Sequence, residues 1–388
     1  MTELKETALA AEHGALGASF TDFGGWRMPL KYTSELDEHH AVRQRAGLFD
    51  LSHMGQVRVV GPGAARFLNT ALVGNFAAVD VGKAKYSLIC DDHGGMLDDL
   101  IGYRVDEQEF LIVPNAANRE VVVRALEERL EAFAAAGVAA EDVEIWDESG
   151  AISLLAVQGP RSEAIISSVV RVDETSIVEE LGYYASTTVT IGGQEVLLAR
   201  TGYTGEDGFE LFLPGEFAGA LWRALLEAGS DFGLVPCGLA SRDSLRLEAG
   251  MPLYGNELST GRTSLEAGLR VVAFSKEESF VGRAALQQGR ATGLGKTTGQ
   301  RLVGLKGLGR RAGRAGYPVL MPQRDQEGGE ARQVGVVTSG QPSPTLGYPI
   351  AMAYVDVAQA EPGTRLDVDV RGRAQPFEVV NLPFYHRR

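Results

Sequence analysis

The stretch Gly94-Gly-Met-Leu-Asp-Asp-Leu-Ile-Gly-Tyr-Arg-Val105 opens with a glycine turn and continues as a β-strand, expected over residues 99–105. The segments 85–89 and 110–113 on either side are also β-prone, and short polar turns separate them from it. These three segments predict a β-meander. A strongly amphipathic helix is expected next, over 116–136. Strands and helices in such unequal blocks indicate an α+β fold.

The rest of the chain continues this mixture and contains no internal repeat. Gly137 is expected to end the long helix. The pair Gly192-Gly193 suits a tight hairpin between two short strands. Strands are predicted over 56–60, 153–157, 188–191 and 195–198, and helices over 64–72, 216–228 and 239–249.

A domain boundary is expected in the run Arg290-Ala-Thr-Gly-Leu-Gly-Lys-Thr-Thr-Gly-Gln300, because residues 293–299 are small, polar and flexible. The sequence after this run is rich in strand and turn residues and has no good amphipathic helix. This pattern predicts a small C-terminal β-barrel or sandwich.

Composition narrows the function. The 388 residues are 44% hydrophobic and carry a net charge of −14, which indicates two or three globular domains and argues against binding nucleic acid or an anionic membrane. Cys90 and Cys237 have no metal-ligand spacing around them, so neither a metal site nor a disulfide is expected. With neither a signal peptide nor a membrane-length apolar run in the sequence, we expect a protein of the bacterial cytoplasm.

Two adjacent carboxylates occur in the opening stretch. Alternation along a strand places Asp99 on the more apolar face, and Asp98 on the opposite face, so the two should not cooperate as an acid/base pair. Asp99 is then either a structural carboxylate with a buried hydrogen bond, or a proton partner that stabilises positive charge on a substrate nitrogen. Its expected face also carries Leu97, Ile101, Tyr103 and Val105.

A second candidate follows the glycine-rich loop that starts at Arg200-Thr-Gly-Tyr-Thr-Gly-Glu-Asp-Gly208. This loop matches no phosphate-binding pattern and leads into a strand, so phosphate binding is rejected. In that strand Glu210 should point away from Phe209 and Leu211, together with Phe212. It is either an exposed strand residue or a carboxylate that accepts two parallel hydrogen bonds from a planar heterocycle such as a pterin.

A third candidate lies on the helix predicted over 239–249. Arg242 and Arg246 are one turn apart, and Asp243 and Glu248 could neutralise them as surface ion pairs. The alternative is that Arg242 binds a ligand that bears a carboxylate. The residues alone leave both interpretations open.

Five segments together closely resemble the glycine cleavage T-protein family. Their order and approximate spacing match the family, and they cover essentially the whole chain. They are Phe49-Asp-Leu-Ser-His-Met-Gly55, residues 94–100, 200–210 and 242–250, and Val337-Thr-Ser-Gly-Gln-Pro-Ser-Pro344.

The resemblance implies a three-domain cloverleaf around a central folate cavity. Two interleaved α+β folate-binding domains would occupy residues 1–285, the second centred on about 55–145, and a β-barrel or jelly-roll-like domain would occupy 295–388. The implied activity is transfer of an aminomethyl group from the lipoyl arm of the H protein to tetrahydrofolate. Methylenetetrahydrofolate, ammonia and reduced lipoyl H protein would be the products, without a metal, flavin or nicotinamide.

The resemblance also implies roles for individual residues. Asp99 would be the catalytic aspartate near the reactive nitrogens of the folate, and Glu210 would recognise the pterin. The other implied folate contacts are Tyr203, Arg242, Tyr86, Met54, Asn115 and, near the C-terminus, Arg387. Two alternatives stay open: a related folate-dependent demethylase, and a folate-binding protein without catalytic activity.

Overall fold

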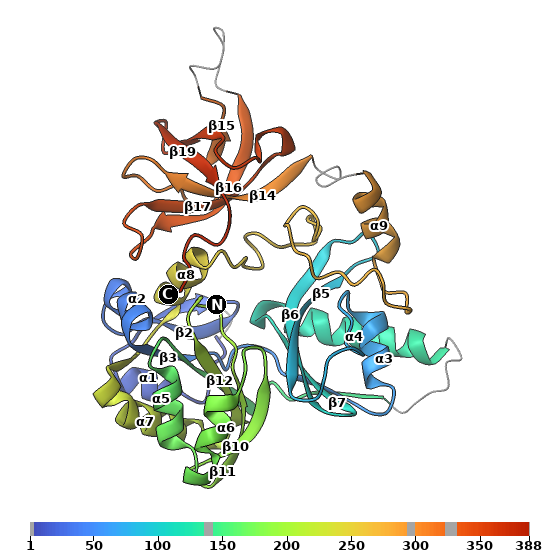
Figure 1. Ribbon diagram of the computed structural model, residues 1–388, viewed down its shortest axis with the longest axis vertical. Helices are drawn as coiled ribbons and strands as arrows, with labels where there is room; N and C mark the ends of the chain where they lie inside the picture. Colours follow the sequence, from blue (N-terminus) through green and yellow to red (C-terminus); the bar gives the residue numbers. More distant parts are fainter. Residues whose placement is uncertain (1–3, 136–142, 293–298, 323–331, 388) are drawn as a thin grey trace.

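The computed structural model describes residues 4–135, 143–292, 299–322 and 332–387. Figure 1 shows three lobes, with a barrel at the top, a sheet with green and blue strands at the lower left and a largely cyan sheet at the lower right. The predicted α+β class is confirmed. No helix within these ranges is long and apolar enough to cross a membrane.

The first lobe is a six-stranded sheet whose outer face is covered by helices. Its strands are antiparallel except β13, which runs parallel to β3. The predicted hairpin joins β10 to β11, and both of its glycines, Gly192 and Gly193, have positive φ, as the favoured two-residue turn requires. In sheet order the strands are β10 (Ser186–Ile191), β11 (Gln194–Ala199), β12 (Gly208–Pro214), β9 (Ile152–Gln158), β3 (Ala46–Asp50) and β13 (Leu234–Pro236).

The second lobe is a five-stranded sheet that is inserted in the sequence between two paired strands of the first. Strands β3 and β9 pair with each other, and the whole second sheet lies between them in the chain. The lobes are therefore interleaved, and the predicted meander is its β5, β6 and β7. In sheet order the strands are β5 (Lys83–Cys90), β6 (Met96–Asp106), β7 (Glu109–Pro114), β4 (Val57–Val60) and β8 (Glu144–Asp147).

Helices cover the outer face of each sheet. Apolar side chains of α5, α6 and α7 pack on the first sheet, and those of α3 and α4 pack on the second. The long predicted helix begins with a 3-10 turn, η1 (Ala116–Asn118), and its expected end at Gly137 lies outside the described residues. These helices are α3 (Ala64–Ala71), α4 (Arg119–Ala135), α5 (Ser162–Val169), α6 (Thr175–Glu180) and α7 (Gly215–Gly229).

The two sheets pack against each other through their inner faces. Their shared core contains Tyr103 and Leu111 from the second sheet and Phe212 from the first. Alternate residues of the second sheet, such as Leu100 and Ile112, belong instead to the core under its helices. Strands β6 and β7 are thus buried on both faces, so the adjacent residues Asp98 and Asp99 of β6 both point into the interior of the protein.

The third lobe is the predicted C-terminal barrel, and it closes on itself. It rests on the first lobe, where Leu247 of α8 contacts the cluster that contains Ile350 and Met352. The boundary expected at 293–299 lies outside the described residues except for Gly299. The barrel strands are β14 (Gln300–Gly307), β15 (Pro318–Leu320), β16 (Gln333–Pro342), β17 (Pro349–Asp356), β18 (Arg365–Asp369) and β19 (Ala374–Val380).

Apart from the short 3-10 turns η2 (Val172–Glu174), η3 (Ser230–Phe232) and η5 (Val357–Gln359), the remaining elements lie near the N-terminus and, in the chain, between β13 and the barrel. Most were not predicted, because their short segments show no clear periodicity. They are α1 (Ala10–Ala15), β1 (Ser19–Phe23), β2 (Trp26–Lys31), α2 (Glu35–Gln44), α8 (Leu239–Glu248) and α9 (Arg283–Thr292), of which α8 was expected.

Candidate functional site

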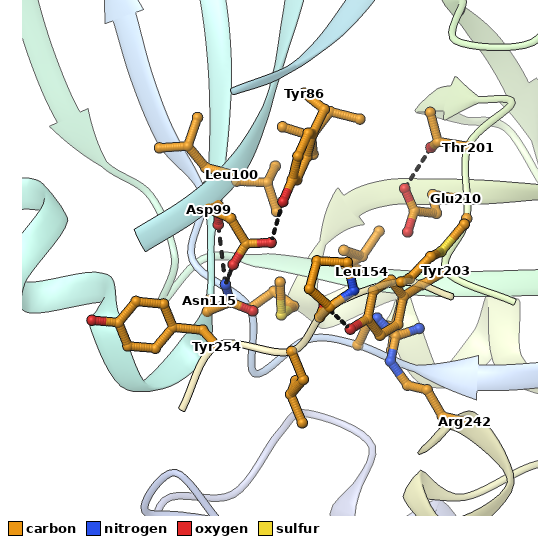
Figure 2. Close-up of a pocket in the computed structure, with 18 of the residues that line it drawn as sticks. Tyr86, Asp99, Leu100, Asn115, Leu154, Thr201, Tyr203, Glu210, Arg242 and Tyr254 are labelled. Atoms are coloured by element: carbon orange, nitrogen blue, oxygen red, sulfur yellow. Dashed lines mark hydrogen bonds between the residues drawn. The ribbon is translucent and has the colours of Figure 1, made fainter. Parts of the chain in front are cut away.

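A cavity of about 260 Å³ lies where the two sheets meet the segment that follows α8. Apolar side chains form most of its wall, and a few polar groups converge on it, as is typical of sites for small molecules. Figure 2 shows Asp99 and Tyr86 on one side and Glu210 and Thr201 on the other. The polar lining residues are His53, Tyr86, Asp99, Asn115, Tyr184, Thr201, Tyr203, Glu210, Arg242 and Tyr254.

Asp99 projects from β6 into this cavity. Its Oδ2 accepts a hydrogen bond of 2.9 Å from the Tyr86 hydroxyl, and its Oδ1 accepts one of 2.8 Å from the Asn115 side-chain amide. Burial raises the pKa of Asp99 to about 6, although both hydrogen bonds favour the ionised form. The carboxylate can therefore take up and release a proton near neutral pH.

Ile101, Tyr103 and Val105 lie in the core between the sheets, on the face predicted for them, but Leu97 packs in the core under the helices and the prediction is wrong for it. The two aspartates point to opposite faces, as predicted, and are nevertheless linked by hydrogen bonds. Asp98 is fully buried on the opposite face, under the helices of the second sheet. The side-chain amide of Asn115 donates to Oδ1 of Asp98 at 2.9 Å as well as to Asp99. The two carboxylates are thus joined through one residue, which comes from the end of the neighbouring strand.

Glu210 projects from β12 into the opposite side of the cavity, away from Phe209 and Leu211, as predicted. It is not an exposed strand residue. Its Oε2 accepts hydrogen bonds from the hydroxyls of Tyr103, at 2.9 Å, and Thr201, at 2.5 Å. In the part of the chain that the structure describes, no side chain or backbone N–H donates to Oε1, so this oxygen is available to a ligand.

Arg242 is not neutralised by its neighbours on the helix. Asp243 pairs with Arg246 at 2.7 Å, and Glu248 pairs with Arg43 at 2.8 Å. Among the described residues no carboxylate forms an ion pair with Arg242. The surface ion-pair interpretation is therefore wrong for this residue, whose guanidinium lines the cavity.

Tyr203 helps to hold Arg242 in place. The guanidinium lies 4.8 Å from the centre of the Tyr203 ring, within the range of a cation–π contact. The Tyr203 hydroxyl donates to the backbone oxygen of Pro252 at 2.5 Å, which fixes the ring against the segment after α8. Burial lowers the pKa of Arg242, because the charged guanidinium is held away from water.

The structure brings seven of the eight residues predicted for the site to the cavity, and Arg387 is the exception. Its guanidinium lies 3.6 Å from Oδ1 of Asp207 and 5.9 Å from the centre of the Tyr183 ring. These contacts hold it in a separate depression, which Arg200 and Glu179 also line. The residues that reach the cavity are Met54, Tyr86, Asp99, Asn115, Tyr203, Glu210 and Arg242.

Sequence reasoning did not single out His53, although it lies in a quoted motif. Only 2% of His53 is exposed, and none of the described residues is a hydrogen-bond partner of its Nδ1. Burial lowers its pKa to about 4, so the imidazole is neutral at physiological pH. Tyr103 was also missed, and it holds Glu210 from the second sheet. The sequence did contain one indication of Tyr103, namely its predicted position on the same strand face as Asp99.

No group of three His, Cys, Asp or Glu side chains in the described ranges could hold a metal ion. The donors that converge on the cavity are instead hydroxyl, amide and guanidinium groups. Together with the carboxylates of Asp99 and Glu210, this set offers both donors and acceptors to a small polar ligand.

Comparisons with known proteins agree over the whole chain. Residues 9–276 match the GCVT N-terminal domain, and residues 300–386 match the glycine cleavage T-protein C-terminal barrel domain. The aminomethyltransferase of Streptomyces coelicolor is 55% identical over 100% of this chain and 99% of its own, and that of Corynebacterium jeikeium is 52% identical over 100% of both.

A solved structure supports the same assignment. The crystal structure of glycine cleavage system aminomethyltransferase T from Bartonella henselae superposes with a TM-score of 0.86 at 35% identity, over 99% of each chain. The predicted family and enzyme class, a transferase of the glycine cleavage system, are confirmed. The chain belongs to the glycine cleavage T-protein family of aminomethyltransferases.

Proposed function

We propose that this protein transfers the aminomethyl group of aminomethylated lipoyl H protein to tetrahydrofolate, in the cytoplasm of a bacterium. The observation that carries the proposal is one cavity with two unlike carboxylates. Asp99 has a pKa raised to about 6, and Glu210 keeps an oxygen free for a ligand. The similarity to aminomethyltransferases over the full chain supports it independently.

The pterin ring of tetrahydrofolate would bind at Glu210. A carboxylate can accept two parallel hydrogen bonds, and the pterin presents an amino group beside a ring N–H. Oε1 is available for one of these donors, and the second would replace the Tyr103 hydroxyl at Oε2, because that hydroxyl can donate to the Thr201 hydroxyl at 3.0 Å instead. The cavity of about 260 Å³ lies just below the range of roughly 300 to 1,000 Å³ for ligand pockets, which fits one ring system better than a whole folate.

Asp99 would then lie near the two nitrogens that receive the carbon atom. In the reaction the C–S and C–N bonds of the donor break, and two new C–N bonds form at the folate. The two N–H protons of the folate pass to the lipoyl sulfur and to ammonia, so no oxidant is required. A carboxylate beside these nitrogens stabilises the positive charge that develops and can carry one of the protons.

Arg242 would contribute to binding rather than to chemistry. Its guanidinium cannot give up a proton at physiological pH, and it lines the cavity beside the Tyr203 ring. We expect it to donate to an oxygen of the bound folate. The stack on Tyr203 holds it in that direction before the substrate arrives.

Formation of methylenetetrahydrofolate from aminomethylated H protein and tetrahydrofolate tests the proposal directly. Formation of methyltetrahydrofolate with dimethylglycine as the donor tests the demethylase alternative, because transfer of a methyl group to folate needs no oxidant. A folate-binding titration tests the non-catalytic alternative. We expect turnover when aminomethylated H protein is the donor, and none when dimethylglycine is the donor. Folate binding without turnover, or turnover with dimethylglycine alone, would overturn the proposal.

Glu210→Gln tests pterin recognition. We expect tetrahydrofolate to bind more weakly by about 1–3 kcal/mol, because the amide has one acceptor oxygen where the carboxylate has two charged ones. Isothermal titration of the two proteins measures the difference. Glu195→Gln, on an exposed position of the neighbouring strand, is the matched control and should leave the affinity unchanged. Equal affinity of wild type and Glu210→Gln would remove this role.

A further inference from the structure

Asn115 shares one side-chain amide between two carboxylates. Its Nδ2 lies 2.9 Å from Oδ1 of Asp98, 2.8 Å from Oδ1 of Asp99 and 3.0 Å from the backbone oxygen of Asp99. All three partners are acceptors, so the NH₂ end of the amide must face them. The orientation of Asn115 is therefore determined by its surroundings, and with it the position of one donor to Asp99.

Asp98 accepts two of the four hydrogen bonds that Asn115 donates to the pair of aspartates. Oδ2 of Asp98 accepts the backbone N–H of Asn115 at 2.8 Å, and its Oδ1 also accepts the side-chain amide of Asn118 at 2.6 Å. These bonds tie the turn between β7 and α4 to the middle of the sheet. Asp98 does not line the cavity, which lies on the other face of its strand.

A carboxylate is the only side chain of this size that satisfies all of these donors. An asparagine at position 98 would present an NH₂ group where a second acceptor oxygen is needed. The carboxylate has a cost, because Asp98 is fully buried and the neighbouring charge of Asp99 opposes its ionisation. Burial, followed by the charge of Asp99, raises the pKa of Asp98.

We propose that Asp98 is a positioning residue for aminomethyl transfer, which acts through Asn115 to orient the carboxylate of Asp99. The inference rests on the catalytic role proposed for Asp99. Asp98 fixes the turn between β7 and α4, which carries Asn115. The side-chain amide of Asn115 and the hydroxyl of Tyr86 then donate to the two oxygens of Asp99.

A double-mutant cycle separates positioning from a purely structural role. We expect Asp98→Asn to reduce kcat about 10- to 100-fold in the wild-type background, as for other residues that orient a catalytic ligand. In the Asp99→Asn background the same change should reduce single-turnover rates less than about threefold, because its target is gone. Asn115→Ala removes the linking amide without a change of charge, and should show the same non-additivity.

The pH profile gives a second readout. Asp98→Asn should lower kcat but leave the acidic limb of kcat/KM near pH 6, because Asp98 orients Asp99 while Asp99 itself takes up the proton. Asp147→Asn is the matched control: this carboxylate of the same sheet bonds to Arg119 and Ser149, away from the cavity, and should leave both kcat and the limb unchanged.

Each outcome decides the inference. Equal losses from Asp98→Asn or Asn115→Ala in the two backgrounds, or an acidic limb that disappears in Asp98→Asn, would overturn it. If Asp98→Asn does not fold, the Asn115→Ala cycle decides alone. A fully active Asp99→Asn protein would instead overturn the catalytic role on which the inference rests, so the two failures are distinguishable.

Discussion

Replacement of Asp99 by Asn should reduce kcat for methylenetetrahydrofolate formation about 10²- to 10⁴-fold, the usual range for loss of a positioned acid or base. The side chains have the same shape, so the cavity and the hydrogen bond from Tyr86 can persist. What disappears is the charge beside the reactive nitrogens. Steady-state kinetics with aminomethylated H protein measure kcat, and a folate titration should show affinity changed by no more than a few-fold. Wild-type kcat in this variant would refute the catalytic role.

The acidic limb of the wild-type pH profile should report the same group. An ordinary aspartate has a pKa near 3.9, whereas burial raises the pKa of Asp99 to about 6. The active form is the carboxylate, so kcat/KM should fall as the pH drops through about 6, where the proton is taken up. Asp99→Asn should lack this limb. A wild-type limb near pH 4, with no change around pH 6, would contradict the assignment.

Local patterns predicted the parts of the fold that local interactions determine. The meander of β5, β6 and β7 joins neighbours in the sequence through short turns, and the Gly192-Gly193 hairpin depends on two backbone angles. The first sheet is different, because β3 pairs with β9 about a hundred residues further on. The periodicity of a single segment cannot encode such a pairing, because the pairing depends on which strand faces are buried against apolar side chains in the folded protein.

The candidate site divides in the same way. The faces of Asp99 and Glu210 follow from alternation along one strand, and both were predicted. The contact between Tyr103 and Glu210 joins residues 107 positions apart, and sequence reasoning missed it. Arg242 is available because Glu248 is engaged by Arg43, at a separation of 205 residues. Charge pairing within one helix could not reveal that choice.

Glu248 connects three parts of the protein: the first lobe, the barrel and the C-terminal segment. Its side chain is fully buried at the end of α8. Oε2 accepts from Arg43 of α2 at 2.8 Å and from the hydroxyl of Thr345 at 2.8 Å, while Oε1 accepts from the hydroxyl of Ser343 at 2.5 Å. The backbone oxygen of Glu248 accepts the N–H of Tyr385 at 2.8 Å.

Glu248→Gln should lower the free energy of unfolding by about 3 kcal/mol, the lower end of the range for breaking a buried ion pair. The lower end applies because Arg43 keeps a second carboxylate, Glu206, at 3.0 Å. Denaturant titration of both proteins at pH 7 measures the difference. Glu378→Gln is the matched control, because its ion pair with Arg365 is half exposed and should contribute at most about 1 kcal/mol. Equal losses in the two variants would contradict a special role for Glu248.

The difference in the free energy of unfolding between wild type and Glu248→Gln should depend on pH, with a sign that follows from the pKa of Glu248. Burial alone would raise the pKa of Glu248, but His39, Ser343 and Arg43 outweigh it and lower the pKa from 4.5 to about 2. A carboxyl group with a lowered pKa stabilises the fold above its unfolded value and loses that contribution as the pH falls through its folded value. Wild type should therefore lose about 3 kcal/mol between pH 4.5 and pH 2 that Glu248→Gln does not lose, because the amide does not titrate. The gap between the two proteins should be full at pH 7 and should close across this window. A gap that is the same at pH 7 and pH 2 would show that packing, rather than the charge of Glu248, joins the lobes.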